Sequence, residues 1–410
     1  MIDFASIRLI DIETLETSNK QKKYLACYKE RFFEVGSHLA LLIDVLKRSD
    51  SPEEAAALYA GATGGRYTAE QIGELAERYL QPVLESENSA PKRPLLVKME
   101  LLKGRDIDRL TRWLGFLFSP VAAVPLLIGI AALEILFFSL FSMHFSIGQV
   151  DMYVILGALG LYLLSSLFHE LGHATACRHY GVSQGGIGFG LYLNFPVFYT
   201  DVSSVWKLRR RQRIVVNMAG TYFQLILLIP FIVGSLYTNN PIVKYFVLTV
   251  NLNFLITLNP FFKFDGYWIM SDLLGVPNLR KRTNELFKYL FARLRGREPE
   301  KKPFLLTMKK TERAFMLVYS AVVNLFFGYY FCYLLPLFLY RFCSTFPSQA
   351  YELVTQLASG ATPDFPLIRT LFAQLLFAGF FGYFAYKMIK KPIVRYRRRK
   401  TENNLTPASE

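Results

Sequence analysis

The sequence predicts a mainly α-helical membrane protein, a polytopic transmembrane helical bundle of about six spans preceded by a small α+β domain. Hydrophobic residues make up 52% of the 410 residues, with 36 Phe and 24 Tyr, well above the usage of soluble domains. They are concentrated in long stretches, and a helix that crosses a bilayer needs about 20 apolar residues. The connections between these stretches alternate between basic and free of Lys and Arg, which is typical of a multi-pass protein.

Six apolar stretches are the candidate spans. They cover residues 114–141, 152–177, 214–237, 241–258, 315–340 and 365–389, and the fourth is the shortest. The connections 142–151, 238–240 and 343–364 contain no Lys or Arg, whereas basic residues crowd the other connections and both flanks. Because cytoplasmic loops carry the basic residues, we expect a protein of the cell inner (cytoplasmic) membrane with both termini in the cytoplasm.

Membrane topology also accounts for the net charge of +15. The lipid bilayer is therefore the expected partner of the basic segments, and nucleic acid is not. After the soluble domain, the predicted parts are a basic linker at 93–113, a transmembrane core at 114–277, a basic cytoplasmic loop at 278–314, two accessory transmembrane helices at 315–390 and a basic cytoplasmic tail at 391–410.

Residues 1–92 are predicted to form the small soluble domain. Residues 24–35 have the composition of a strand pair, and Ser37 is expected to cap a helix that reaches Leu46. Two capping boxes start two further helices, at Ser51-Pro52-Glu53-Glu54 and Thr68-Ala69-Glu70-Gln71. A strand pair followed by three helices is the outline of a winged-helix fold.

This order resembles the winged-helix peptide-recognition domains of ribosomal-peptide maturation, a family typified by the peptide chaperone of pyrroloquinoline quinone biosynthesis. The resemblance covers about residues 20–90. It implies that a leader peptide binds to the domain as an added strand. The alternative is a helical regulatory or anchoring domain of no particular kin.

The second apolar stretch contains, near its end, the run His169-Glu170-Leu171-Gly172-His173. Two His four residues apart project from one face of a helix, a spacing at which both can hold one zinc ion, and the Glu between them is placed to act as a general base. A His pair on a helix can also be a hydrogen-bonded pair at an interface. The setting at the end of a membrane span favours the metal site.

A catalytic zinc needs a third protein ligand. No Glu follows Glu170 until Glu285, and the remaining candidates are His179, Asp201, Asp265 and Asp272. His179 has the spacing of the third metzincin ligand. Ala176 stands where that pattern has Gly, so we expect the helix to continue and to carry His179 about 15 Å along its axis from His169.

Asp265 is the favoured third ligand. The fourth stretch ends on the same side of the membrane as the second, so alternating topology brings Asp265 to the depth of the histidines. Pro260 breaks the helix and Gly266 permits a tight turn, which lets Asp265 face inward. Asp272 is expected to be a solvated cap.

These residues resemble the two motifs of the site-2 protease family of membrane-embedded zinc metalloproteases. The motifs are His169, Glu170 and His173, then Asn259, Pro260, Asp265 and Gly266. The resemblance covers about residues 150–275, and the second motif is similar to that of the peptide zinc metalloprotease branch. It implies one Zn²⁺ per chain held by His169, His173 and Asp265, with Glu170 as the catalytic base.

The chain departs from this family in the third stretch. A Gly-Pro-x-x-x-Asn element appears here only as residues 219–224, with Thr221 in place of Pro and with Gln224, one residue before the Asn position, as the nearest amide. There is no room for a PDZ domain, so residues 1–92 are the expected substitute for substrate selection. The family motif implies a substrate contact at Asn259.

A Gly-rich, aromatic run follows the second stretch, with Gly185, Gly186 and Gly188 at its start. We expect either a hairpin or loop that dips into the membrane beside the site, or a plain interfacial loop. In the first case the run pairs with an unwound substrate as a strand, and its glycines contact the substrate.

Several polar residues lie inside the predicted spans. Glu134 is either functional, as ionisable groups in membranes usually are, or a hydrogen-bond acceptor for a neighbouring helix. The amides of Asn217, Gln224, Asn251 and Asn253 are expected to hold helices together.

Three functions are open. The leading one is a cytoplasm-facing zinc endopeptidase that removes a leader from, or trims, a ribosomally made peptide. The second is regulated intramembrane proteolysis of a membrane-anchored regulator or signal peptide. The third is a non-proteolytic membrane peptide-binding or export subunit that works with peptide export machinery, and the intact set of site residues argues against it.

Overall fold

The structure is a computed structural model. It describes residues 3–29, 31–84, 95–140, 150–192, 195–297, 303–360, 362, 364–379, 381–383 and 386. The chain is mainly helical and forms two compact units, one of Met1–Tyr192 with Pro196–Ala321 and the other of Leu193–Phe195 with Val322–Glu410. The predicted basic tail, 391–410, lies outside the described residues.

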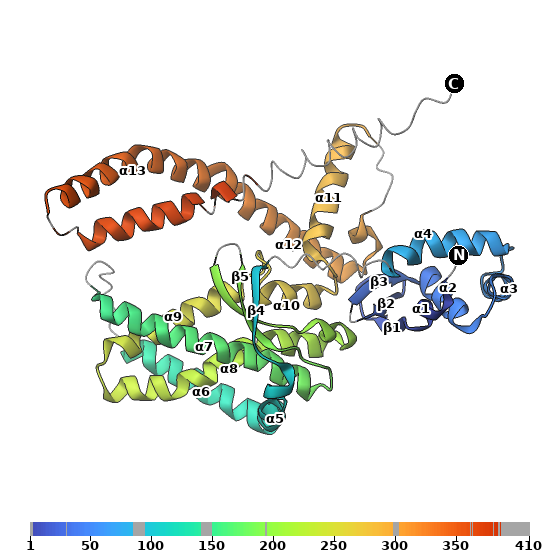
Figure 1. Cartoon of the computed structure of the whole chain (residues 1–410), viewed down its shortest axis with the longest axis horizontal. Helices are drawn as coiled ribbons and strands as arrows, with labels where there is room; N and C mark the ends of the chain where they lie inside the picture. Colours follow the sequence, from blue (N-terminus) through green and yellow to red (C-terminus); the bar gives the residue numbers. More distant parts are fainter. Residues whose placement is uncertain are drawn as a thin grey trace. The chain divides into compact units, whose positions relative to one another are not determined.

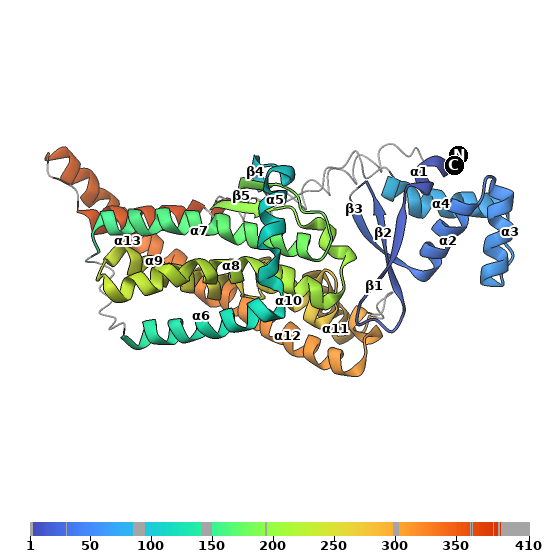
Figure 2. The ribbon, with the colours of Figure 1, turned by 90° about the horizontal axis from the view of Figure 1, so that it is seen from below.

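The N-terminal part of the chain, up to residue 84, is a three-stranded antiparallel sheet packed against helices (Figure 2). Its elements are α1 (Phe4–Arg8), β1 (Asp11–Leu15), β2 (Lys23–Tyr28), β3 (Arg31–Gly36), α2 (Ser37–Arg48), α3 (Pro52–Thr63) and α4 (Ala69–Leu84). The strand order β1-β2-β3 makes β1 and β3 the edges of the sheet. Ile7, Ile43, Leu46 and Ile72 are fully buried in the core between sheet and helices.

The strand pair and the two capping boxes predicted for this part of the chain are confirmed. The predicted strand pair is β2 and β3, whereas β1 was not predicted. Ser51 Oγ accepts a hydrogen bond from Glu54 N at 3.2 Å, and Thr68 and Gln71 exchange side-chain bonds with each other's backbone N–H at 3.1 and 3.2 Å. The prediction for Ser37 is wrong: Gly36 is the N-cap of α2, in extended backbone and without a side-chain cap bond. The winged-helix assignment stays a prediction.

Five helices in the described residues are long and apolar enough to cross a membrane. They are α6 (Pro120–Leu140), α7 (Met152–His179), α8 (Arg210–Tyr237), the continuous helix Lys310–Ala358 and the helix Phe365–Tyr383. The predicted fourth span is α9 (Pro241–Thr257), an apolar helix of 17 residues. The protein is thus a multi-pass membrane protein by its helices, with five long candidate spans where six were predicted.

The continuous helix corrects one predicted connection. It consists of α12 (Lys310–Tyr329), a π-helical turn (Tyr330–Leu334) and α13 (Leu335–Ala358), so no loop begins at Cys343. Residues 343–358 are more polar than a membrane span, but polarity alone does not end a helix, and α13 continues through them and through Pro347. The helix ends just before Gly360, which has a φ of 73°. Gln374 then bonds Gln349 Oε1 at 3.1 Å and joins α13 to the last helix.

The transmembrane core consists of α6, α7, α8 and α9, which run alongside one another (Figures 1 and 2). Its buried centre includes Phe137, Leu228, Ile232 and Phe246. All four amides expected to hold helices together bond a neighbouring helix. Asn251 Nδ2 donates to both carboxylate oxygens of Glu134 at 3.3 and 3.2 Å, and Asn253 Oδ1 accepts from the Tyr162 hydroxyl at 3.0 Å. Asn217 Nδ2 donates to Asp272 Oδ2 and Gln224 Nε2 donates to Ser165 Oγ, both at 3.3 Å. Glu134 therefore accepts hydrogen bonds from a neighbouring helix.

A second sheet lies beside the core (Figure 1). Its order is β4 (Leu95–Leu102), β5 (Ile187–Tyr192) and β6 (Phe195–Thr200), with β4 antiparallel to β5. The Gly-rich run thus forms two neighbouring strands. The segment predicted as a linker contains β4 and α5 (Gly104–Leu114), because β4 pairs with residues almost a hundred positions away and no local signal marks such a partner.

The glycines of this run are required by close packing inside the sheet. A Cβ atom at Gly186 would lie 2.2 Å from Glu100 Oε1, and one at Gly188 would lie 2.4 Å from the Tyr199 ring. Gly185 donates its N–H to Asp201 O at 2.8 Å, and a Cβ there would lie 2.5 Å from Asp201 Cβ. These contacts account for the glycines without a substrate, and their contact with one stays a prediction.

The remaining elements follow α9 or connect the longer helices. They are α10 (Asp265–Leu274), α11 (Leu279–Leu294) and 3₁₀ turns at Gly115–Phe118, Ser203–Lys207 and Phe304–Thr307.

Candidate metal centre

Three ligand atoms from two helices converge on one point. His169 and His173 lie one turn apart near the end of α7, and Asp265 is the first residue of α10. Their Nε2 atoms lie 3.0 and 3.4 Å from Asp265 Oδ2, and 3.1 Å from each other. Ligands at about 2.1 Å from a tetrahedral zinc are about 3.4 Å apart, so the spacing fits one ion.

Hydrogen bonds to α8 orient both imidazoles. His169 Nδ1 lies 3.1 Å from Gln224 Oε1, and His173 Nδ1 lies 2.7 Å from the carbonyl oxygen of Val216. Because both partners are acceptors, each Nδ1 carries the proton and each Nε2 presents a lone pair toward Asp265. This is the tautomer that a metal ligand needs.

The carboxyl of Asp265 supplies the negative charge of the cluster. Its Oδ2 is buried and accepts no hydrogen bond of normal geometry from the described part of the chain. An ionised, otherwise unsatisfied oxygen facing two imidazole nitrogens is a donor set that zinc prefers.

Two glycines let α8 approach this site. A Cβ at Gly172 of α7 would lie 2.3 Å from Ala219 O, and a Cβ at Gly220 of α8 would lie 2.5 Å from His169 Nε2. The helices therefore touch backbone to backbone under the histidines. Gln224 and Gly220 both belong to the element in which the chain departs from the family pattern. Gln224 also donates to Ser165 of α7, so it holds the two helices together as predicted and orients His169 as well.

The turn between α9 and α10 places Asp265. A Cβ at Gly266 would lie 2.1 Å from Leu258 O, so the start of α10 lies against the end of α9. Asn259 Oδ1 accepts from Phe261 N at 2.8 Å, and Pro260 O accepts from the Tyr319 hydroxyl at 2.8 Å. Asn259 thus shapes the turn, and its contact with substrate stays a prediction.

The other third-ligand candidates are engaged elsewhere. The His179 ring lies 5.7 Å from the Phe118 ring at the end of α7, as expected from a helix that continues past Ala176. The Asp201 carboxylate accepts from Ser203 N and Oγ at 3.1 and 2.6 Å. Asp272 is 6% exposed and bonds Arg213, so the prediction of a solvated cap is wrong.

A cavity adjoins the turn of α7 that carries Glu170. The Thr200 hydroxyl, at the end of β6, donates to the carbonyl oxygen of Glu170 at 3.1 Å. Thr200 lines a cavity of about 320 Å³ together with Trp206 and Trp268, whose indoles meet edge to face at 6.3 Å. The cavity is large enough for one amino-acid side chain.

Substitution of Gly220 by Ala is expected to weaken metal binding. The new methyl group would displace the His169 ring, and we expect zinc affinity to fall about 10–100-fold, the usual cost of disturbing the groups that orient a ligand. Competition with a chromogenic chelator measures the affinity. Gly234→Ala is the control, because it lies on the same helix and a Cβ there meets nothing within 4 Å. Equal affinities in the two variants would contradict the assignment.

The helices and the cluster define a multi-pass membrane protein with a candidate His-His-Asp metal centre. The chain is similar to YydH of Bacillus subtilis (strain 168), which is named as a candidate peptide zinc metalloprotease protein, with 26% identity over 127 residues. The aligned region is 30% of this chain and 50% of YydH, so the chain spans about half the length of that relative. No protein-family model matches the chain. No solved structure matches it.

Proposed function

We propose that the protein is a membrane-embedded zinc metalloprotease of the site-2 protease type that processes a ribosomally made peptide or its leader. The convergence of His169, His173 and Asp265 at the end of a candidate span carries this proposal. The likeness to YydH supports the zinc metalloprotease class. The finer statements, on the protease type and the substrate, rest on the motifs and the placement of the residues.

In the proposed peptide hydrolysis, the metal ion and the side chains of the protein have different roles. A zinc ion held by the cluster would polarise the scissile carbonyl and lower the pKa of a water molecule. The Glu170 carboxylate takes the proton of the attacking water and returns it to the nitrogen of the leaving amine. Gln224 and Val216 keep the protons of both imidazoles on Nδ1 and so keep Nε2 available.

The second sheet suggests how the substrate reaches the site. β6 is an edge strand by the order β4-β5-β6, and Pro196 within it is typical of an edge because Pro has no N–H to donate. Its last residue, Thr200, contacts the backbone of Glu170. An unwound substrate added beside β6 would run toward Glu170. The cavity of Thr200, Trp206 and Trp268 would then hold one of its large apolar side chains.

The N-terminal domain is the proposed recruiter of the leader. Its edge strand β3 offers backbone groups to an added strand. A cavity of about 860 Å³ between the sheet and the helices supplies side-chain contacts, and its lining includes Tyr24, His38, Tyr59, Tyr67 and Tyr79. Tyrosines give large contact areas at a small entropic cost, which suits peptide binding.

Metal removal tests the proposal directly. We expect the protein purified in detergent to hold one zinc per chain and to cleave members of a quenched-fluorescence peptide library. Dialysis against a chelator should abolish cleavage, and added Zn²⁺ should restore it. A zinc-loaded protein that cleaves no peptide of the library, and no leader-bearing precursor, would favour the non-proteolytic export subunit.

A further inference from the structure

The helix that carries the third candidate ligand is held at its far end. α10 begins at Asp265, ends at Leu274 and is about 15 Å long. A helix this short moves as a rod, so the groups that fix its C-terminal end also set the position of Asp265 relative to the histidines. These groups come from two other parts of the chain.

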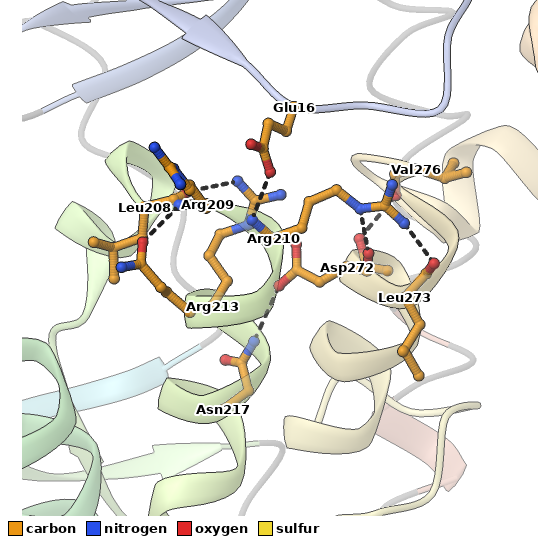
Figure 3. A network of polar contacts seen from close by, with 11 residues as sticks. Glu16, Leu208, Arg209, Arg210, Arg213, Asn217, Asp272, Leu273 and Val276 are labelled. Carbon is orange, nitrogen blue, oxygen red and sulfur yellow. Dashed lines mark hydrogen bonds and ion pairs between the residues drawn. The ribbon is translucent and has the colours of Figure 1, made fainter. Parts of the chain in front are cut away.

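The first set comes from α8 (Figure 3). Arg213 Nε lies 2.7 Å from Asp272 Oδ1, and Asn217 Nδ2 donates to the other carboxylate oxygen at 3.3 Å. Arg210 donates from Nε to the carbonyl oxygen of Asp272 at 2.7 Å and from Nη2 to that of Leu273 at 2.5 Å. A buried ion pair adds little net stability, since desolvation offsets the attraction. It does favour one relative position of the two helices, because breaking it would leave a buried charge without a partner.

The same helix also orients the histidines. Val216 and Gln224 of α8 bond the two imidazoles, and Gly220 lies under His169. Arg213 and Asn217 lie on the turn of α8 that also carries Val216. Both helices that carry the candidate ligands, α7 and α10, are therefore hydrogen-bonded to α8, and α8 fixes their relative position.

The second set comes from the N-terminal domain, from the loop of residues 16–22 between β1 and β2. Ser18 donates its N–H to Gly275 O at 2.9 Å and its hydroxyl to Leu274 O. Glu16 Oε2 accepts from the backbone N–H of Arg210 at 3.0 Å (Figure 3). The last carbonyls of a helix have no partner within it, so a side chain of another domain caps α10.

The fit around Ser18 is close. Ser18 is 1% exposed, and Gly275 adopts the left-handed conformation with a φ of 62°. A Cβ at Gly275 would lie 2.5 Å from Ser18 Oγ and 2.8 Å from Arg210 Cζ, so the cap leaves no room for a larger residue. The loop is also hydrogen-bonded to the 3₁₀ turn Phe304–Thr307, because Lys20 N donates to Thr307 O at 3.0 Å.

We propose that the loop of residues 16–22 positions α10, so that the N-terminal domain sets the geometry of the metal centre as well as recruiting the peptide. The inference rests on the proposed function. Ser18, Glu16, Arg210, Arg213 and Asp272 are positioning residues in this scheme, because they act on the reacting atoms through Asp265. A leader bound to the sheet would then change the turnover of the site, and not only the concentration of substrate near it.

The test compares variants of the full chain on a leader-bearing precursor and on a leaderless peptide with the same cleavage site. We expect Ser18→Ala and Glu16→Ala to weaken zinc binding by roughly tenfold or more and to lower kcat on both substrates, as disturbance of outer groups does at metal sites. Glu16→Gln retains an oxygen that can accept from Arg210 and is expected to stay near wild type.

Ser51→Ala is the matched control. It removes the N-cap bond of α3 in the same domain and touches no residue of α10. We expect it to lower the thermal stability of the domain but to leave zinc affinity and kcat unchanged. If Ser18→Ala cannot be purified, the comparison of Glu16→Ala with Glu16→Gln decides. The hydrogen bond between Glu16 and Arg210 is exposed, so we expect both variants to fold.

Failure of the coupling and failure of the proposed function give different results. Variants of Ser18 and Glu16 with the zinc affinity and kcat of the wild type, and with only a raised KM for the leader-bearing precursor, would overturn the coupling and leave recruitment intact. A wild-type protein that holds no zinc or cleaves neither substrate would instead overturn the proposed function.

Discussion

Substitution of Glu170 by Gln is expected to lower kcat for peptide hydrolysis about 10²–10⁴-fold, the usual contribution of a general acid–base group. Gln has the size of Glu but its amide cannot accept the proton of the attacking water. The bonds that orient His169 and His173 come from Gln224 and Val216, so they are unaffected. Zinc should therefore remain at one per chain, and its measurement beside kcat separates the loss of the base from the loss of the metal.

Glu134→Gln is the control for this variant. Glu134 is a carboxyl inside another helix of the core, bonded to Asn251, and Gln can keep an oxygen in that contact. We expect its activity to stay within a few-fold of wild type. Activity above about a tenth of wild type in Glu170→Gln would show that another group moves the proton. An equal loss in both variants would point to a general need for carboxyls in the core.

The parts of the site that the sequence predicted are those with local signals. The spacing of His169 and His173 requires only a helix, and α7 provides it. Pro260 and Gly266 indicated the turn that brings Asp265 inward, and the structure places Asp265 Oδ2 within 3.4 Å of both imidazoles. Their binding of zinc stays a prediction. The two capping boxes marked the starts of α3 and α4 for the same reason, since a cap depends on a few adjacent residues.

The parts that were missed depend on partners far away in the chain. β4 is recognisable only through its pairing with β5, and Ser18 only through the end of α10, more than 250 residues later. Asp272 looked like a solvated cap because its partner, Arg213, lies on another helix. Gln224 could have been found, since it lies one residue before the Asn position of the family element and its side chain is within reach of His169.

Removal of the third candidate ligand has the other large expected effect. Asp265→Ala leaves two neutral imidazoles, without the ionised oxygen that completes the set, and we expect zinc affinity to fall by more than about 100-fold, beyond the cost of losing an outer group. Zinc should then be absent after dialysis, and hydrolysis with it. Asp265→Asn keeps the shape and one oxygen but removes the charge, so its affinity should lie between those of Asp265→Ala and the wild type.

His179→Ala provides the comparison that decides the ligand set. His179 packs beside Phe118 and is the residue that a metzincin-like pattern would choose, so both hypotheses predict a clear but opposite result. With Asp265 as ligand, His179→Ala retains one zinc per chain and Asp265→Ala does not. The reverse outcome would move the third ligand onto α7. The two substitutions lie on different helices, α7 and α10. The thermal unfolding temperature of each variant shows whether a loss of zinc comes from the missing ligand or from a helix that no longer packs.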